Sequence, residues 1–429
     1  MLSVRPGWGR VGSQPGAEYL FFSKYTATDS YNGANSIYPS NIRLSNLQWE
    51  EKETWNVGFD LGLFDNRVTA DFNIYTQMTS KLLMTNVNIP SSSGFPSLSW
   101  TNVGKMRNNG WEFNINGTDV VKVGKFRLGF NVTFANNKNE IVEMEPTALA
   151  NLNKDFDNNN GSYLTRVQLN NPFGAIYGFR YKGVYQYSDY SEVEVPGVSG
   201  PNAPVARDEN GNVIRDKAGF TIPMVFGYDK TTNTELYEFQ GGDAIYEDIN
   251  HDGNINELDI VYLGSSLPKI TGGWGLKLSY GRWSLNAQFN FRAGNKVVNR
   301  ARMDAESMHN NNNQAASVNW RWRTEGQLAE IPRALYNKGF NYLGSDRFVE
   351  DASFMRLNYL SLGYSLDPKL LRRIGVTSLS INLNASNLFC LTNYSGADPE
   401  IGYGGMGVAT DGAKTPRSRQ FTARVQIGF

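Results

Sequence analysis

The chain has 429 residues, a formal net charge of zero at pH 7 and a pI of about 6.8. This balance argues against a nucleic-acid-binding protein, which would carry a basic field. Cys390 is the only cysteine, which excludes an intrachain disulfide and cysteine-based zinc sites, and His251 and His309 are the only histidines, which leaves little for histidine-centred catalysis. No run of about 18 apolar residues occurs, so no transmembrane helix is predicted.

The strongest pattern along the chain is strict alternation of apolar and polar side chains. It is clear in WNVGFDLGL (55–63) and recurs at 126–134, 283–292, 379–386 and 421–429. Each run is about ten residues long, the length that a tilted strand needs to cross a bilayer. The polar faces carry Asn, Gln, Arg and Asp, and the apolar faces often end in Trp, Phe or Tyr, as an aromatic girdle does. We therefore predict an all-β fold, an antiparallel transmembrane β-barrel.

Short and long connections alternate between these strands. The short ones are 65–66, 119–124, 281–282 and 367–376, and the long ones are 79–109, 136–270, 294–352 and 388–419. Outer-membrane barrels alternate in this way, with short periplasmic turns and long extracellular loops. The segment 178–187 also alternates, and the parity of the crossings assigns it to a hairpin within an extracellular loop.

The number of strands indicates part of a larger barrel. Nine clear strands follow residue 53, and two weaker ones precede them near Leu2–Trp8 and Glu18–Tyr25. Bacterial single-chain barrels use an even number of strands, and open sheet edges are not stable in lipid. A count of about eleven therefore predicts the C-terminal half of a larger barrel.

The segment DINHDGNINELD (248–259) has the spacing of a calcium-binding loop. Oxygen-bearing side chains occupy positions 1, 3, 5, 7 and 12 of the loop, and they are Asp248, Asn250, Asp252, Asn254 and Asp259. Gly253 stands at position 6, where the chain turns sharply. Position 12 is Asp rather than Glu, so Mg²⁺ is an alternative to Ca²⁺, and a polar turn without an ion is an alternative to both. Neither flank has helical periodicity, so we predict a cation that pins an extracellular loop.

Several segments together resemble the SusC/RagA family of TonB-dependent outer-membrane transporters. They include residues 9–23, 46–75, 93–115, 248–273, 321–334 and 393–402, and the final FTARVQIGF is similar to the assembly signal of outer-membrane proteins. The resemblance implies a barrel of about 22 strands with an N-terminal plug. It also implies import of glycans or peptides with a SusD-like lipoprotein, powered by the TonB complex. Residues 1–429 would then be the C-terminal part of the barrel, with plug domain and signal peptide absent.

Contact residues are predicted in the extracellular loops. Trp320 and Trp322 could stack on sugar rings or contact a lid protein, and Tyr181 and Tyr185 could line a substrate path. The alternative for each is packing within the loop. No nucleophile elbow, phosphate loop or HExxH motif occurs, so we predict that the chain is not an enzyme.

Two other classes of protein remain open at this point. One is a passive porin-type barrel, which would have the same wall without TonB coupling. The other is a soluble, secreted β-rich carbohydrate-binding protein, in which the apolar strand faces would pack against each other. The importer and the passive porin both predict a location in the outer membrane, with its lipid as a partner.

Overall fold

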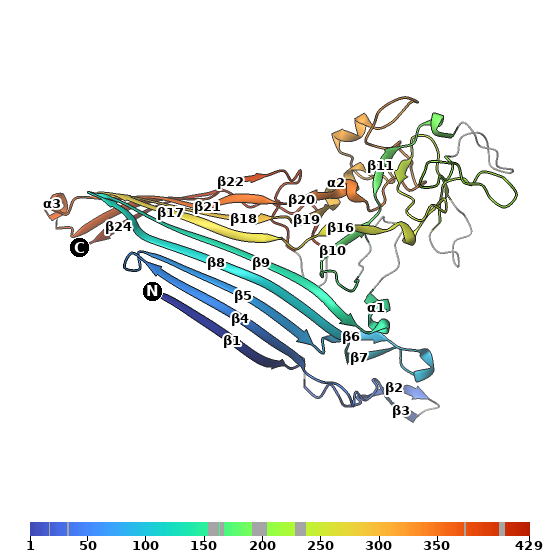
Figure 1. Ribbon diagram of the computed structural model, residues 1–429, viewed down its shortest axis with the longest axis horizontal. Helices are drawn as coiled ribbons and strands as arrows, with labels where there is room; N and C mark the ends of the chain where they lie inside the picture. Colours follow the sequence, from blue (N-terminus) through green and yellow to red (C-terminus); the bar gives the residue numbers. More distant parts are fainter. Residues whose placement is uncertain are drawn as a thin grey trace.

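The dominant feature of the fold is a ten-stranded antiparallel sheet that curves into a wall (Figure 1). The computed structural model describes residues 1–429 except 17, 32–33, 153–162, 164–166, 191–203, 228–236, 373–374 and 403–407. The wall strands, in their order across the sheet, are β1 (Leu2–Ser13), β4 (Glu50–Leu63), β5 (Val68–Ser80), β8 (Gly104–Val123), β9 (Phe126–Met144), β17 (Ile270–Tyr280), β18 (Trp283–Ala293), β21 (Phe354–Ser365), β22 (Ser378–Thr392) and β24 (Gln420–Gly428). The predicted all-β antiparallel wall is confirmed.

Cross-strand pairing sorts the side chains of the wall onto two faces. One row of partners runs across five strands and is apolar throughout: Val4, Phe59, Phe72, Phe113 and Phe134. The neighbouring positions on the opposite face are polar, and there Arg5 pairs with Asp60. Outer-face side chains such as Trp55, Leu383 and Phe421 are exposed rather than covered by a second sheet. The apolar faces therefore do not form a two-layer core, which contradicts the alternative of a soluble sandwich.

The strand count corrects one expectation. The nine strands after residue 53 are all present, and the weak candidate Leu2–Trp8 is part of β1. Glu18–Tyr25 is not a wall strand, because its described residues form turns that lead into a hairpin of β2 (Tyr25–Tyr31) and β3 (Ala34–Pro39). The wall thus has ten strands rather than eleven, with β1 and β24 at its two edges.

Short turns and long connections lie at opposite ends of the wall. The wall strands are joined at one end by tight turns, including the one between β4 and β5, and both chain termini lie at this end (Figure 1). The other end carries every long connection between described wall strands, including the hairpin of β6 (Leu83–Asn88) and β7 (Ser97–Asn102). No helix in the described part of the chain is long and apolar enough to cross a membrane.

The compact apolar core lies outside the wall, in the loops at its far end. Its largest buried side chains come from segments far apart in sequence, and they include Tyr177, Phe179, Phe239, Tyr246, Ile255 and Leu343. The short strands of this loop module and its neighbours are β10 (Ala175–Gly178), β11 (Tyr181–Val184), β12 (Val225–Phe226), β13 (Tyr237–Glu238), β14 (Ala244–Tyr246), β15 (Asn254–Ile255), β16 (Val261–Ser265), β19 (Lys296–Asn299), β20 (Val349–Asp351) and β23 (Thr410–Asp411). The helices are α1 (Pro146–Leu152), α2 (Arg300–Glu306) and, at a short turn, α3 (Pro368–Leu371).

The predicted hairpin at 178–187 is wrong in its pairing. The segment does lie in the loop module, as expected, but its strands do not pair with each other. Strand β10 pairs with β16, and β11 pairs with β14, each across at least 60 residues of sequence. These long-range pairs, rather than a local turn, hold the segment within the loop module.

Candidate functional site

The loop module places Tyr181 and Tyr185 in different surroundings. The Tyr181 hydroxyl donates a hydrogen bond to the carbonyl of Glu330 at 2.7 Å, and the Arg347 guanidinium lies 5.5 Å from its ring centre. Burial raises the pKa of Tyr181 to about 12. Tyr185 is buried, packs on Phe239 and lines a pocket of about 670 Å³. A role in substrate contact stays a prediction for both residues, and of the two only Tyr185 lines this pocket.

The two predicted tryptophans differ in exposure. Trp320 ends a short 3₁₀ helix (Ala316–Trp320) and is 78% exposed. Trp322 is only 5% exposed and packs within the loop, which is the alternative that the sequence left open for it. Its Nε1 donates to Oε1 of Gln186 at 3.1 Å, and its ring packs over Gly242, where a side chain would collide with it. Trp322 holds the 321–334 segment against the module, and Trp320 is the one available for contact.

The segment 248–259 wraps its side-chain oxygens around a tight turn at Gly253. Oδ2 of Asp248 accepts a hydrogen bond from the backbone N–H of Gly253 at 2.8 Å, and Oδ1 of Asp252 accepts from the N–H of Asn254 at 2.8 Å. Gly253 has φ +80°, a conformation that favours glycine. Oδ1 of Asn250 accepts from the N–H of Asp252 at 3.2 Å. The predicted ligand positions therefore share one turn.

Asp259 closes the turn from the other end. It is fully buried, and its two carboxylate oxygens accept from the backbone N–H groups of Ile249 at 2.8 Å and Asn256 at 2.9 Å. Burial raises the pKa of Asp259 to about 6, the two backbone donors oppose that rise, and the charges of Asp248 and Asp252 add to it. Asp248 and Asp252 thus lie near enough to disfavour the charged form of Asp259.

The fit of this loop to a cation rests on its donors. The side-chain Oδ1 of Asn254 is buried and has no hydrogen-bond partner. An unpaired acceptor beside hard carboxylate and amide oxygens suits Ca²⁺ or Mg²⁺. In the described residues, no three acidic, histidine or cysteine side chains converge as a metal-binding group. The ligand types and the turn fit a cation, while the carboxylates do not stand at coordination geometry.

A second cluster, which the sequence interpretation did not identify, lies where the last long loop meets the wall. Nη2 of Arg356 on β21 lies 2.6 Å from Oδ1 of Asp398, and both side chains are buried. Oε1 of Glu400 lies 2.7 Å from Nη2 of Arg417 and 3.9 Å from Nη2 of Arg292 on β18. We call these five residues the loop latch. Asp398 and Glu400 occur in NYSGADPEIG (393–402). The sequence feature that could have indicated their partners is the presence of arginines on the polar faces of two strands, Arg292 and Arg356.

A third buried group joins two halves of the loop module. Asp243 is fully buried and accepts from Nε of Arg333 at 2.7 Å, from the Tyr237 hydroxyl at 2.7 Å and from Nδ2 of Asn341 at 3.2 Å. The backbone N–H of Gln240 also donates to it at 2.9 Å, and loss of any of these donors would leave a buried carboxylate oxygen underpaired, which is costly. Asp243 therefore anchors the 333–341 segment to β13 and β14.

A wall with an apolar outer face and a polar inner face, topped by folded loops at one end, defines an outer-membrane β-barrel protein. Residues 2–204 match the family model "TonB dependent receptor-like, beta-barrel". TonB-dependent receptor P39 of Formosa agariphila is 26% identical over 100% of this chain and 40% of its own length. TonB-dependent receptor SusC of Bacteroides thetaiotaomicron is 24% identical over 100% of this chain and 37% of its own length. The chain is thus similar along its whole length to TonB-dependent receptors, SusC among them, in agreement with the predicted resemblance to the SusC/RagA family.

The solved structures agree on the fold. The RagAB peptide transporter matches with a TM-score of 0.72 at 23% identity, covering 100% of this chain and 41% of that chain. The RagAB peptide importer in its open-open state matches with a TM-score of 0.69. The chain spans about two fifths of the length of these relatives. These relatives are TonB-dependent receptors and transporters rather than enzymes. This agrees with the prediction of an outer-membrane location and with the prediction that the chain is not an enzyme.

Proposed function

We propose that this chain forms the C-terminal wall and outer loops of a TonB-dependent importer in the outer membrane. The observation that carries the proposal is the amphipathic wall together with a folded loop module, in a chain similar along its entire length to TonB-dependent receptors. In such a protein the wall separates lipid from a polar lumen. The remaining three fifths of the protein would supply further strands, which pair with β1 and β24, and the segment that contacts TonB.

We propose glycans or peptides as the substrate class, with peptides favoured. RagAB, a structural neighbour of this chain, is a peptide transporter, which supports the second class. The pocket beside Tyr185 offers an apolar floor with Met224 and a charged rim with Arg207, Asp208 and Glu247. A mixed rim of this kind suits the alternating charges and apolar side chains of a peptide.

We propose that a SusD-like lipoprotein docks on the loop around Trp320. This loop exposes large apolar side chains that nothing in the described residues covers, namely Trp320, Leu328 and Tyr336. Exposed aromatic side chains are enriched at protein interfaces. Trp320→Ala with Leu328→Ala should weaken co-purification of the lipoprotein, whereas Leu370→Ala, an exposed leucine at the turn end of the wall, should not.

We propose that residues 248–259 bind Ca²⁺, with Mg²⁺ as a weaker competitor, through the side chains of Asp248, Asn250, Asp252, Asn254 and Asp259. The shared turn, the unpartnered Oδ1 of Asn254 and the negative charges of Asp248 and Asp252 near buried Asp259 support this assignment. A chelator should increase proteolytic cleavage of the 136–270 region in the intact receptor. Asp248→Ala with Asp252→Ala should abolish the difference between chelator and calcium, and cleavage that is unaffected by chelator in the wild type would contradict ion binding.

Import is tested by uptake of labelled oligopeptides and oligosaccharides in cells that express the full-length protein, with and without an intact TonB complex. The proposal predicts uptake of one class that disappears when TonB is removed. Uptake that persists without TonB would instead support the passive porin. Uptake of neither class, with the protein present at the surface, would overturn the substrate assignment.

A further inference from the structure

The lipid-facing side of the wall contains a pocket of about 950 Å³ across β1, β4, β5, β8 and β9. Most of its lining residues belong to two adjacent rows of cross-strand partners on one face of the sheet, and the row between them, Gly7, Asn56, Tyr75 and Gly110, forms its floor. The row farther from the loops is Pro6, Val57, Ile74, Trp111 and Asn136, and the row nearer the loops is Trp8, Trp55, Thr76, Asn109 and Lys138. These positions share a face with Phe59 and Phe72, so the pocket opens toward hydrocarbon rather than toward the lumen.

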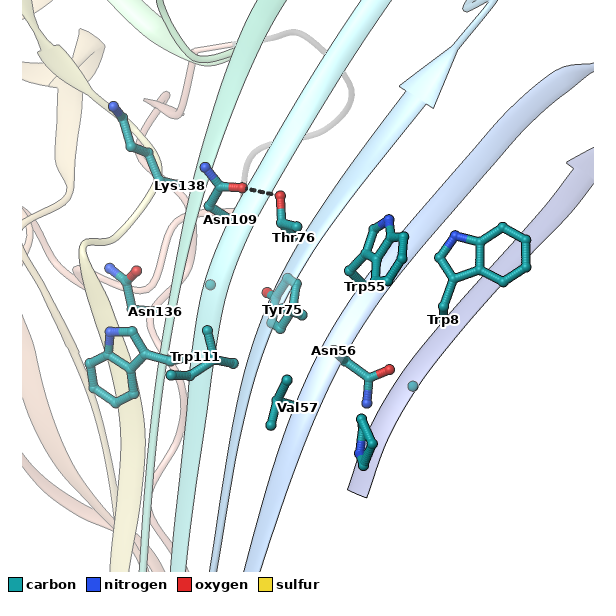
Figure 2. Close-up of a pocket in the computed structure, with 14 residues that line it drawn as sticks. Trp8, Trp55, Asn56, Val57, Tyr75, Thr76, Asn109, Trp111, Asn136 and Lys138 are labelled. Atoms are coloured by element: carbon teal, nitrogen blue, oxygen red, sulfur yellow. Dashed lines mark hydrogen bonds between the residues drawn. The ribbon is translucent and has the colours of Figure 1, made fainter. Parts of the chain in front are cut away.

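Three tryptophans form the sides of this pocket. The indoles of Trp8 and Trp55 lie 5.9 Å apart on neighbouring strands, and Trp111 lies on the other side of Val57 (Figure 2). Shorter side chains between them, Val57 and Ile74, leave a hollow. On the opposite face the Tyr75 ring lies against Gly110, which closes the wall behind the hollow.

The tryptophans also set the depth of the pocket in the membrane. Nε1 of Trp8 and Nε1 of Trp55 donate to the same oxygen, Oε1 of Glu53, at 3.0 and 3.1 Å. Glu53 lies on the next row toward the loops. The polar edges of both indoles therefore point toward the headgroups and their apolar edges toward the acyl chains, the orientation of an interfacial aromatic girdle.

The charge at the rim is positive. The next row toward the loops contains Arg10, Glu53, Arg107 and Glu140, which balance, and Lys138 adds one positive charge. Lys138 is exposed and has no ion-pair partner among the residues that the structure describes. A lysine at headgroup level attracts an anionic headgroup, so an apolar hollow below it suits one molecule with both parts.

We propose that this pocket holds an acyl chain of an anionic, phosphate-bearing membrane lipid, with the phosphate at Lys138. The volume lies within the range of small-molecule sites, and the pocket is continuous with the surface that lipid already covers. The tryptophans contribute the apolar contacts for any lipid, and Lys138 selects for negative charge. This inference depends on the outer-membrane location and not on the direction or substrate of transport.

The test is native mass spectrometry of the full-length receptor after delipidation, with phosphatidylglycerol or phosphatidylcholine added. Lys138→Gln should lower retention of phosphatidylglycerol by about fivefold, the factor that about 1 kcal/mol per lysine represents, and leave phosphatidylcholine unchanged. Trp55→Ala with Trp111→Ala should lower retention of both lipids.

Two matched variants serve as controls. Lys277→Gln removes the same charge from the lumen-facing side of β17, and Trp283→Ala removes an outward indole at the turn end of the wall. Both should retain lipid as the wild type does. Equal loss in Lys138→Gln and Lys277→Gln would overturn the proposal, as would wild-type retention in the double tryptophan variant. A second copy of the receptor that dissociates in the tryptophan variant, with lipid retention unchanged, would assign the pocket to a protein interface instead.

Discussion

Arg356 and Asp398 form a buried ion pair that joins the last long loop to the wall, with Nη2 of the arginine 2.6 Å from Oδ1 of the aspartate. The pair is 42 residues apart in sequence. Oδ1 of Asp398 also accepts from the backbone N–H of Glu400 at 2.9 Å, so the carboxylate orders its own loop as well as holding it to β21. The loop latch therefore sets the position of residues 393–402 at the mouth of the lumen.

Removal of one partner of this pair should open the loop. Arg356→Met leaves Asp398 buried without its cation, which costs about 3 to 5 kcal/mol. Hydrogen exchange of residues 393–402 should increase accordingly in the intact receptor. Arg180→Met, which breaks the half-exposed pair with Glu247, should cost less than about 1 kcal/mol. Equal effects of the two substitutions would contradict the latch.

The latch should resist mild acid. Burial acts to raise the pKa of Asp398, but the backbone N–H groups of Glu400 and Arg417 and the Arg356 guanidinium lower it below its ordinary value. The Asp398 carboxylate therefore contributes fully to the stability of the loop above about pH 4, its pKa in the unfolded chain. This stabilisation is lost as pH falls through the lower pKa of the folded state. Exchange of residues 393–402, corrected for intrinsic rates, should be the same at pH 7 and pH 5 and rise only below about pH 4. A rise between pH 7 and pH 5 would refute this assignment.

Alanine substitutions at two glycines of the loop module distinguish the cost of backbone strain from the cost of close packing. Gly253 and Gly211 have φ of +80° and +82°, so alanine at either position costs about 1 to 2 kcal/mol of strain. An added Cβ at Gly253 would lie 2.9 Å from Cβ of Ala206, whereas at Gly211 it would meet nothing within 4 Å. Gly253→Ala should therefore cost about 1 to 3 kcal/mol more than Gly211→Ala in the local stability of the module. Hydrogen exchange of β12 and β15 measures the difference, and equal costs would show that the close packing is absent.

The two faces of one strand should tolerate charge differently. Phe113 lies in the apolar row of the outer face, and Asn114 beside it donates to Asp71 on the polar face. Phe113→Arg should destabilise the folded protein in vesicles by about 2 to 4 kcal/mol, the cost of an arginine that faces the hydrocarbon. Asn114→Arg should cost much less, because its cation lies in water beside Asp71. A similar cost for both would show that the faces are not separated into lipid and lumen.

The wall could be predicted because alternation is a local property of each strand. In β4 and β24 the side chain at each position shows which face it occupies, whatever the partner strand. The prediction of a wall strand at Glu18–Tyr25 was wrong because adjacent aromatic residues there resemble the end of a membrane strand. In the structure Phe21 and Phe22 pack on each other with ring centres 4.1 Å apart, inside a turn.

The loop module could not be predicted to the same depth, since its pairs join segments far apart in sequence. Nothing near Tyr181 in the chain indicates that β11 pairs with β14, and nothing near Trp322 indicates that Gly242 receives its ring. The candidate ion loop could be proposed from the sequence because its oxygen-bearing side chains lie within twelve residues. The loop latch could not be proposed, because Arg292 and Arg356 lie on wall strands while Asp398 and Glu400 lie in a distant loop.

The account depends most directly on which face of each wall strand meets lipid. Nitroxide labels at successive positions 70–76 of β5, in the full-length receptor with Cys390→Ser and reconstituted in bilayers, report this by their collisions with oxygen and with a water-soluble nickel complex. We predict a period of two residues, with oxygen access highest at 70, 72, 74 and 76 and nickel access highest at 71, 73 and 75. Uniform access, or the opposite phase, would contradict the assignment of this sheet as a membrane wall.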